Sequence, residues 1–300
     1  MRLWILFITS LIFFSCKDNS KNDTGAIAKY DTAALEALYK KSPNDSLLTE
    51  LVYAYGSEIS NSKNKEDKIQ SLRKAIKLTN THEYEAYKSV FLMELIKTDP
   101  QGTADELLQL GRIYEDEENT VLQSIVYLGF KHRFPKDPRH KDINHKIFLK
   151  LGDHKLYFKN LLKDVFENTE NGGINVEKGQ NYINQVVAFG LGFAGDPAIP
   201  NYLMISADVA RAIGDPNTSV GQYDWVYNYY PEYSKAPLAL FLKGYEIDSS
   251  LKKYEDARKV YETFLQVYPN DTLAKDVKFL IQNLGKNPDD AFKEMLPAEQ

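Results

Sequence analysis

Gly190, Gly192 and Gly195 have the GxGxxG spacing with which a loop can cradle a pyrophosphate. Such a site requires a strand before the glycines and a helix that starts at the last glycine, because the N-terminus of that helix meets the phosphates. Here Asp196-Pro197 and Pro200 interrupt the required helix start, and no alternation of strands and helices follows. The apolar residues of 182–189 instead predict a helix that ends in a glycine cap, so we expect no nucleotide site.

Histidine is the other residue type here that could bind a metal or carry protons. Zinc sites on a helix prefer histidines at i and i+4 with a third fixed ligand, but His140 and His145 are five residues apart. We therefore expect solvated surface histidines, no metal site and no cofactor. No GxSxG, HExxH or P-loop pattern is present, and the single cysteine is residue 16, so we expect no enzyme. The histidines are His82, His132, His140, His145 and His154.

A run of aromatic residues leaves two interpretations open. Six aromatic residues occur within eleven positions, and they cannot all face inward from one helix. They either pack inside an aromatic-rich helical core or offer exposed rings to a protein or to the face of a sugar. These residues are Tyr223, Trp225, Tyr227, Tyr229, Tyr230 and Tyr233.

The elements that would position these side chains are helices. From residue 30 onward apolar residues recur at i, i+3, i+4 and i+7, and no sustained alternation suggests strands. Glycine and proline fall between the apolar stripes, where they end helices. The segments are roughly 12 to 17 residues long with short turns, which predicts antiparallel helical hairpins. Examples of the stripes are 47–55, 69–76, 90–96, 107–114 and 121–130.

Two short sequences recur along the chain. Tyr-Pro occurs at 230–231 and again at 268–269. Residues 43–47 (Pro-Asn-Asp-Ser-Leu) resemble residues 269–273 (Pro-Asn-Asp-Thr-Leu), and in both copies we expect the Asp or the Ser/Thr to cap the next helix. Recurrence at a fixed period predicts a repeat architecture, in which each hairpin covers the apolar side of its neighbour.

Residues 237–269 give the best single unit, with small Gly244 and Ala257 followed by Tyr261 and the ending Phe264-Leu265-x-x-Tyr268-Pro269. This pattern resembles the tetratricopeptide repeat, in which small residues let the paired helices approach closely. The preceding unit, 200–231, resembles it less well. The ending is similar to that of the repeat lipoprotein of the β-barrel assembly machinery and of Tol-Pal-associated repeat proteins. The resemblance covers about residues 197–285.

The resemblance implies an all-α, tetratricopeptide-like superhelix whose concave face, formed by the first helix of each pair, binds partners. A final helix over 289–295 would close the array. The projected repeat places five residues toward the groove, and Trp225 is a further candidate from the aromatic run. The partner-binding candidates are Asp208, Arg211, Trp225, Phe241, Tyr245 and Asp248.

The N-terminus contains the features of an export signal. Met1-Arg2 is followed by a largely apolar stretch over 3–14, which is too short to span a bilayer. Ser15-Cys16 after it resembles the lipobox of bacterial lipoproteins, which implies a signal peptide over 1–15 and lipidation of Cys16. Polar residues 16–29 would form a flexible tether. The alternatives are an ordinary secretory signal or an uncleaved anchor.

The composition indicates which class of partner the chain binds. The chain has 300 residues, Lys+Arg 37 against Asp+Glu 42, a net charge of −5 and no long run of lysine and arginine, which argues against nucleic acid as its main ligand. We therefore expect a helical repeat scaffold over 30–300, lipid-anchored at the outer membrane on its periplasmic side or at the cell surface. It would bind protein partners of an envelope assembly. The alternative function is a glycan- or solute-binding lipoprotein.

Overall fold

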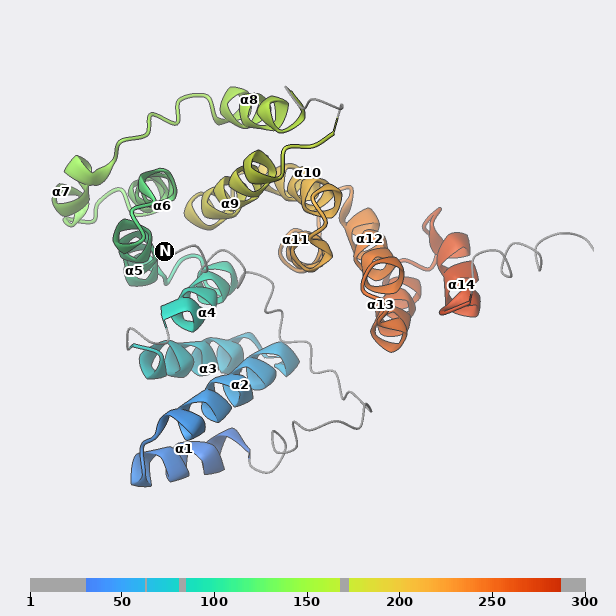
Figure 1. The fold of residues 1–300 in the computed structure, drawn as a ribbon, viewed down its shortest axis with the longest axis horizontal. Helices are drawn as coiled ribbons and strands as arrows, with labels where there is room; N and C mark the ends of the chain where they lie inside the picture. The colour runs from blue at the N-terminus through green and yellow to red at the C-terminus, as the bar shows by residue number, and fades with distance from the viewer. Residues whose placement is uncertain (1–30, 63, 81–84, 168–172, 287–300) are drawn as a thin grey trace, which may run out of the picture. The chain divides into compact units, whose positions relative to one another are not determined.

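The computed structural model describes residues 31–62, 64–80, 85–167 and 173–286 (Figure 1). Those residues form helices joined by turns and contain no strand, so the predicted all-α class is confirmed for them. The expected signal peptide over 1–15, Cys16 with the tether to 29, and the helix over 289–295 lie outside the described residues. None of the described helices has the length and apolar content that a bilayer-crossing helix needs.

The chain divides into two compact units. Unit 1 contains Met1–Leu151 and Ala188–Ala194, and unit 2 contains Gly152–Val187 and Gly195–Gln300. In unit 1, each of the first five helices packs against the next one along the chain (Figure 1). The helices of unit 1 are α1 (Thr32–Lys41), α2 (Asp45–Asn61), α3 (Lys65–Leu78), α4 (Glu85–Thr98), α5 (Ala104–Asp116), α6 (Thr120–Arg133), α7 (His140–Ile143) and the 3-10 helix η3 (Asn144–Lys146).

The core of unit 1 follows the apolar stripes of the sequence. Leu48, Leu51, Val52 and Tyr55 of α2 are buried at the spacing of one helix face, against buried residues of α3 and α4 such as Leu72. Burial of apolar surface contributes roughly 25 cal/mol per Å2, so this shared stripe holds the successive hairpins together.

Unit 2 begins with α8 (His154–Phe166) and the first part of α9 (Val176–Gly192). The ring of Phe158 anchors α8, with its centroid 4.8 Å from that of Tyr202 and 6.2 Å from that of Tyr182. From α10 onward each helix packs against its successor (Figure 1). These helices are α10 (Ile199–Ala212), α11 (Pro216–Tyr229), α12 (Ala236–Ser249), α13 (Tyr254–Val267) and α14 (Ala274–Asn283).

The predicted close approach of paired helices is present at Gly244. A Cβ added there would lie 2.6 Å from Cε1 of Tyr261, so the ring occupies the space that a side chain would need. The same arrangement occurs in unit 1, where a Cβ on Gly111 of α5 would lie 2.1 Å from Cε1 of Tyr127 of α6. A small residue facing a tyrosine thus occurs well before residue 197, where the sequence pattern first becomes clear.

The recurrent Pro-Asn-Asp sequence does not cap helices as predicted. In the first copy, Asn44 is the cap of α2, because its Oδ1 accepts a hydrogen bond from Leu47 N at 2.9 Å. In the second copy, α14 begins at Ala274 without a side-chain cap, and Asp271 Oδ1 accepts from Leu273 N before the helix starts. The residue before the predicted cap fits better in the first copy because its side chain reaches the third amide of the helix.

The glycines of 190–195 belong to a helix end and not to a phosphate loop. Helix α9 continues through Gly190 to Gly192, and Gly195 then adopts a positive φ of 102°. Gly192 also permits a close approach within unit 1, since a Cβ on Gly129 of α6 would lie 2.3 Å from its Cα. The sequence predicted a helix that ends in a glycine cap directly after residue 189, but the helix continues to Gly192, and Gly192 also serves the packing against Gly129.

Candidate functional site

Asp208 and Arg211 lie together on the exposed side of α10. Asp208 Oδ1 accepts a hydrogen bond from the Tyr223 hydroxyl at 2.7 Å and lies 3.4 Å from Nη2 of Arg211. Burial, together with the bond to Asp208, raises the pKa of Tyr223 above its usual range. Tyr223 therefore remains a neutral donor that holds the Asp208 carboxylate in place.

Arg211 also connects α10 to α12 through a buried carboxylate. Its Nε lies 3.7 Å from Oε1 of Glu246, a residue that is only 1% exposed. Glu246 Oε2 accepts a hydrogen bond from Ser250 Oγ at 2.8 Å, whereas Oε1 has no hydrogen bond among the residues that the structure describes. A buried carboxylate is costly without a cation, so Arg211 is held at this position between the first helices of two successive hairpins.

Phe241, Tyr245 and Asp248 form a stripe along α12. The rings of Phe241 and Tyr245 stack with centroids 6.4 Å apart and an interplanar angle of 18°, and Tyr245 is 40% exposed. Asp248 is half-buried one turn later, and burial raises the pKa of its carboxyl. Because Arg211 contacts Glu246, the residue next to Tyr245, the two stripes of α10 and α12 are neighbours. We call these five residues, Asp208, Arg211, Phe241, Tyr245 and Asp248, the unit 2 surface.

Trp225 does not belong to the unit 2 surface. It lies on α11 and is 7% exposed, so its ring packs inside the unit instead of facing solvent. The other aromatic residues of 223–233 are buried or partly buried too. Of the two interpretations left open by the sequence, packing in an aromatic-rich core therefore describes this run.

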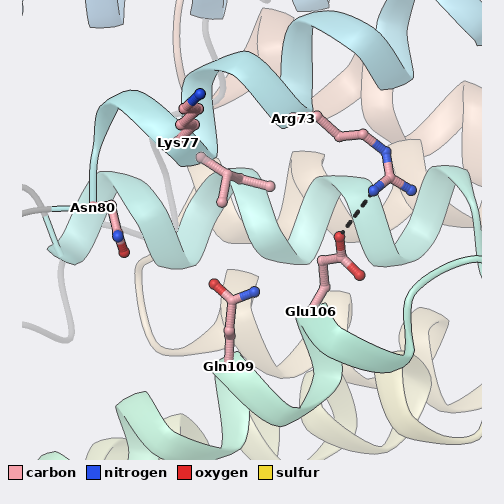
Figure 2. A pocket seen from close by; sticks show the side chains of 6 residues that line it. Arg73, Lys77, Asn80, Glu106 and Gln109 are labelled. Atoms are coloured by element: carbon pink, nitrogen blue, oxygen red, sulfur yellow. Dashed lines mark hydrogen bonds and ion pairs between the residues drawn. The ribbon is translucent and has the colours of Figure 1, made fainter.

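Unit 1 has a comparable surface between α3 and α5 (Figure 2). An opening of about 280 Å3 is lined by side chains of both helices and by Asn80 after α3. Arg73 Nη1 of α3 lies 3.3 Å from Oε1 of Glu106 of α5, and Lys77 and Gln109 lie along the same opening. Glu106 is buried, so it resembles Glu246 in being a buried carboxylate that an arginine of the preceding first helix contacts.

The sequence did not predict roles for Glu106 and Glu246. Each follows an arginine by a distance close to one hairpin, 33 residues for Arg73 and 35 for Arg211. This spacing of Arg and Glu on successive first helices is a signal in the sequence, but it is visible only once the hairpins have been aligned. Without that alignment, a glutamate in a helix is expected to face solvent, because glutamate is rarely buried unless it is paired.

A tyrosine hydroxyl next to an acidic residue recurs in the hairpins. Tyr127 donates to Glu115 Oε2 at 3.4 Å, and burial together with Glu115 raises the pKa of Tyr127 to about 12. Glu115 follows Gly111 by four residues, as Asp248 follows Gly244. Burial and nearby Asp248 likewise raise the pKa of Tyr261 above its usual range. The Gly-x-x-x-acid spacing could have indicated these positions from the sequence.

Two histidines differ from the prediction that they are solvated. His154 is partly buried, with Nδ1 3.0 Å from the Tyr202 hydroxyl and Nε2 3.3 Å from Oδ2 of Asp196. The ring of His140 lies edge-on to Phe130, and its Nε2 is buried. Tertiary contacts between α8 and α10, which periodicity does not reveal, bury His154. No group of three His, Cys, Asp or Glu side chains in the described ranges is arranged to hold a metal ion.

No family model matches the chain, and no curated protein and no solved structure matches it either.

Proposed function

We propose that this chain is a lipid-anchored helical-repeat scaffold that binds protein partners in an outer-membrane assembly. The observation that carries the proposal is the unit 2 surface, where a 40%-exposed Tyr245 stacks on Phe241 beside charged side chains of the neighbouring first helix. Tyrosine and arginine dominate the energetics of protein interfaces, because they combine apolar contact area with hydrogen bonding. The opening between α3 and α5 gives unit 1 a similar first-helix surface (Figure 2).

We further propose that the hairpins are tetratricopeptide-like. The small-residue-to-tyrosine contacts at Gly111–Tyr127 and Gly244–Tyr261 support this, as does the packing of each helix on its successor from α1 to α6 and from α10 to α14. In such arrays the second helices support the packing and the first helices present the binding face. The unit 2 surface lies on α10 and α12, which are first helices in this assignment.

Site-specific photocrosslinking in intact membranes tests the scaffold. A photoreactive amino acid at position 245 is expected to crosslink to an envelope protein, which mass spectrometry of the product identifies. The same amino acid at position 259 is the matched control, because Lys259 is an exposed residue of a second helix, α13. Equal crosslinking from the two positions, or none from position 245, would contradict the assignment of the binding face.

The lipid anchor rests on the resemblance of Ser15-Cys16 to a lipobox. Lipidation of Cys16 would hold the chain at the outer membrane, facing the periplasm or the cell surface. Fractionation of cells that express Cys16→Ala tests the anchor: the variant is expected in the soluble fraction, and metabolic labelling with a fatty acid should be lost with it. Retention in the membrane fraction would argue for an uncleaved anchor.

The glycan-binding alternative requires an accessible aromatic platform. Trp225 is buried, so it offers little ring surface to a sugar. Binding of the purified chain to a glycan array, abolished by Tyr245→Ala, would favour the alternative over the scaffold.

A further inference from the structure

Residues 131–151 of unit 1 differ from the rest of the chain in charge. They contain seven lysines and arginines and two aspartates, a net charge of +5 in a chain whose net charge is −5. This segment covers the end of α6, helices α7 and η3, and the residues that follow η3. Such a local excess of one sign attracts a partner of the opposite sign.

Part of this positive charge is used inside unit 1. Arg133 donates to the carbonyl oxygen of Leu191 at 2.9 Å, and its partly buried guanidinium has a pKa lowered by burial to about 10. Arg139 pairs with Asp137 at 2.6 Å, and Lys146 pairs with Glu115 at 2.7 Å. These cations stabilise the fold and leave little charge for a partner.

Three lysines of the segment face solvent instead. Lys136, Lys141 and Lys150 are exposed, and in the part of the chain that the structure describes none of them forms an ion pair. Asp142 is the one exposed acidic residue within residues 131–151. Within residues 131–151 the three exposed lysines therefore outnumber the one exposed carboxylate, and the exposed Asp105 nearby is already paired with Arg139.

The same segment presents a phenylalanine to solvent. Phe148 is 71% exposed, the largest exposure among the exposed large apolar side chains described. Residues 147–151 lie outside the helices, and Ile147 has an extended backbone with φ −99° and ψ 106°. The backbone N–H groups of Phe148 and Leu149 donate to Ser124 Oγ of α6 at 3.0 and 3.4 Å. Ile147 and Leu149 are partly buried, whereas the side chain of Phe148 between them is exposed.

The preceding helix η3 is attached to α6 as well. Lys131 Nζ of α6 donates to Asn144 Oδ1 at 2.7 Å, whereas Ser124, further back along α6, accepts from the backbone N–H of Phe148. Residues 144–149 therefore run antiparallel to α6 and are attached to it at both ends. Phe148 is exposed because of this attachment, and water must solvate its ring at a cost of roughly 1.5–3 kcal/mol relative to full burial.

We propose that Lys136, Lys141, Phe148 and Lys150, here called the Phe148 surface, bind the anionic headgroup face of a phospholipid bilayer. The lysines contact phosphate groups, and the phenylalanine ring enters the boundary between headgroups and acyl chains. A lysine near an anionic bilayer contributes about 1 kcal/mol, and an isolated apolar side chain adds to this by insertion. A protein partner is disfavoured because protein hot spots cluster in packed, desolvated pockets, whereas Phe148 projects alone.

This inference is independent of the lipid anchor and of the unit 2 surface. Lipidation at Cys16 would raise the local concentration of the Phe148 surface at the membrane, but the surface itself binds without an acyl chain. The test therefore uses residues 16–300 with Cys16→Ala, so that binding of the polypeptide is measured alone.

The experiment is sedimentation with sucrose-loaded vesicles at low salt. Vesicles of phosphatidylcholine with one quarter phosphatidylglycerol are expected to bind the protein, and vesicles of phosphatidylcholine alone are not. Lys136→Gln/Lys141→Gln/Lys150→Gln is expected to weaken partitioning by at least about 10-fold, and Phe148→Ser by about 5-fold. Circular dichroism verifies that these exposed-site variants keep their helical content.

Matched variants in unit 2 control for net charge and for apolar exposure. Lys178→Gln/Lys275→Gln/Lys278→Gln removes three exposed lysines, and Val267→Ser removes a 50%-exposed apolar side chain. Each is expected to change partitioning by less than about 2-fold, because these residues lie outside the Phe148 surface. An equal loss in the control and test lysine variants would overturn the proposal.

Insertion of the ring is measured separately with Phe148→Trp. Its fluorescence is expected to shift to the blue on anionic vesicles and to be quenched by brominated acyl chains. The proposal would be overturned if neither fluorescence change occurs, or if the protein binds neutral and anionic vesicles equally. Binding to polyglutamate without binding to vesicles would also overturn it.

Discussion

Gly129→Ala tests whether the α6–α9 contact limits the packing of unit 1. A Cβ at residue 129 would lie 2.3 Å from Cα, 2.5 Å from C and 2.6 Å from O of Gly192. These atoms belong to backbone, so no side chain can rotate to make room, and the helices must separate. Separation would also weaken the hydrogen bond of 2.9 Å from Arg133 to the Leu191 carbonyl.

The expected size of the effect follows from two opposing contributions. Alanine is favoured over glycine inside a helix by about 1 kcal/mol, whereas overpacking costs about 1–3 kcal/mol. With rigid backbone on the opposing side and a hydrogen bond of about 1 kcal/mol at risk, we expect a net loss of about 2 kcal/mol in the free energy of unfolding. For an m-value near 2 kcal/mol/M, the urea midpoint falls by about 1 M.

Urea titration of residues 16–300 with Cys16→Ala measures this loss. Far-UV circular dichroism follows all helices, whereas the fluorescence of Trp225, the one tryptophan after residue 15, follows unit 2. The dichroism midpoint is expected to fall more than the fluorescence midpoint. Gly173→Ala is the matched control, because an added Cβ there has no atom within 4 Å, and it is expected to stay within about 0.5 kcal/mol. An unchanged or higher midpoint for Gly129→Ala would refute the steric reasoning.

Arg211→Ala is expected to lower the free energy of unfolding by about 1 kcal/mol, because it removes the cation beside the buried Glu246 carboxylate. Adding Glu246→Gln should recover part of that loss in urea titration, and an additive further loss would contradict the pairing. Burial raises the pKa of Tyr127 and of Tyr202 to about 12, above the ~10 of an unfolded chain. Their contribution to stability is therefore complete below pH about 10 and is lost as the pH rises toward 12. Difference titrations against Tyr127→Phe and Tyr202→Phe isolate the absorbance of these two residues at 295 nm, which should rise together with helix loss, whereas a rise near pH 10 in the folded protein would contradict the assignment. Burial alone would raise the pKa of Glu94, but Lys97 and Lys68 lower it to about 2. Glu94→Gln should therefore destabilise the protein at pH 7, by an amount that shrinks between pH 5 and pH 2 in thermal melts, and a constant difference would refute the ion pairs.

The helices were predictable because each one carries its own apolar stripe. Leu48, Leu51, Val52 and Tyr55 recur at helical spacing, and all four are buried in α2. The close approach at Gly244 was also predictable, since a small residue in a helix followed by an aromatic residue in the next indicates paired packing.

The candidate site was predictable only in part, because its chemistry depends on the register between helices. Asp208 and Arg211 were recognised as surface residues, but the partner of Arg211 is Glu246, whose burial arises where α10 meets α12. Trp225 shows the opposite case: a residue type typical of interfaces is buried because both sides of α11 contact other helices. Phe148 gave no helical signal, since it lies outside the helices in a segment attached to α6 through Ser124.

At Gly111 and Gly244 the distance between paired helices depends on glycine and tyrosine residues that differ from the residues proposed to bind a partner. Tyrosine rings contributed by α6 and α13 set how far apart the helices lie, and they rest on glycines that have no side chain to vary. The outward-facing residues of α5 and α12 therefore do not determine the distance between the helices. Under the proposed scaffold function, substitutions there would change the affinity for a partner while the spacing between the helices stays constant, so new binding specificities could evolve at little cost to folding.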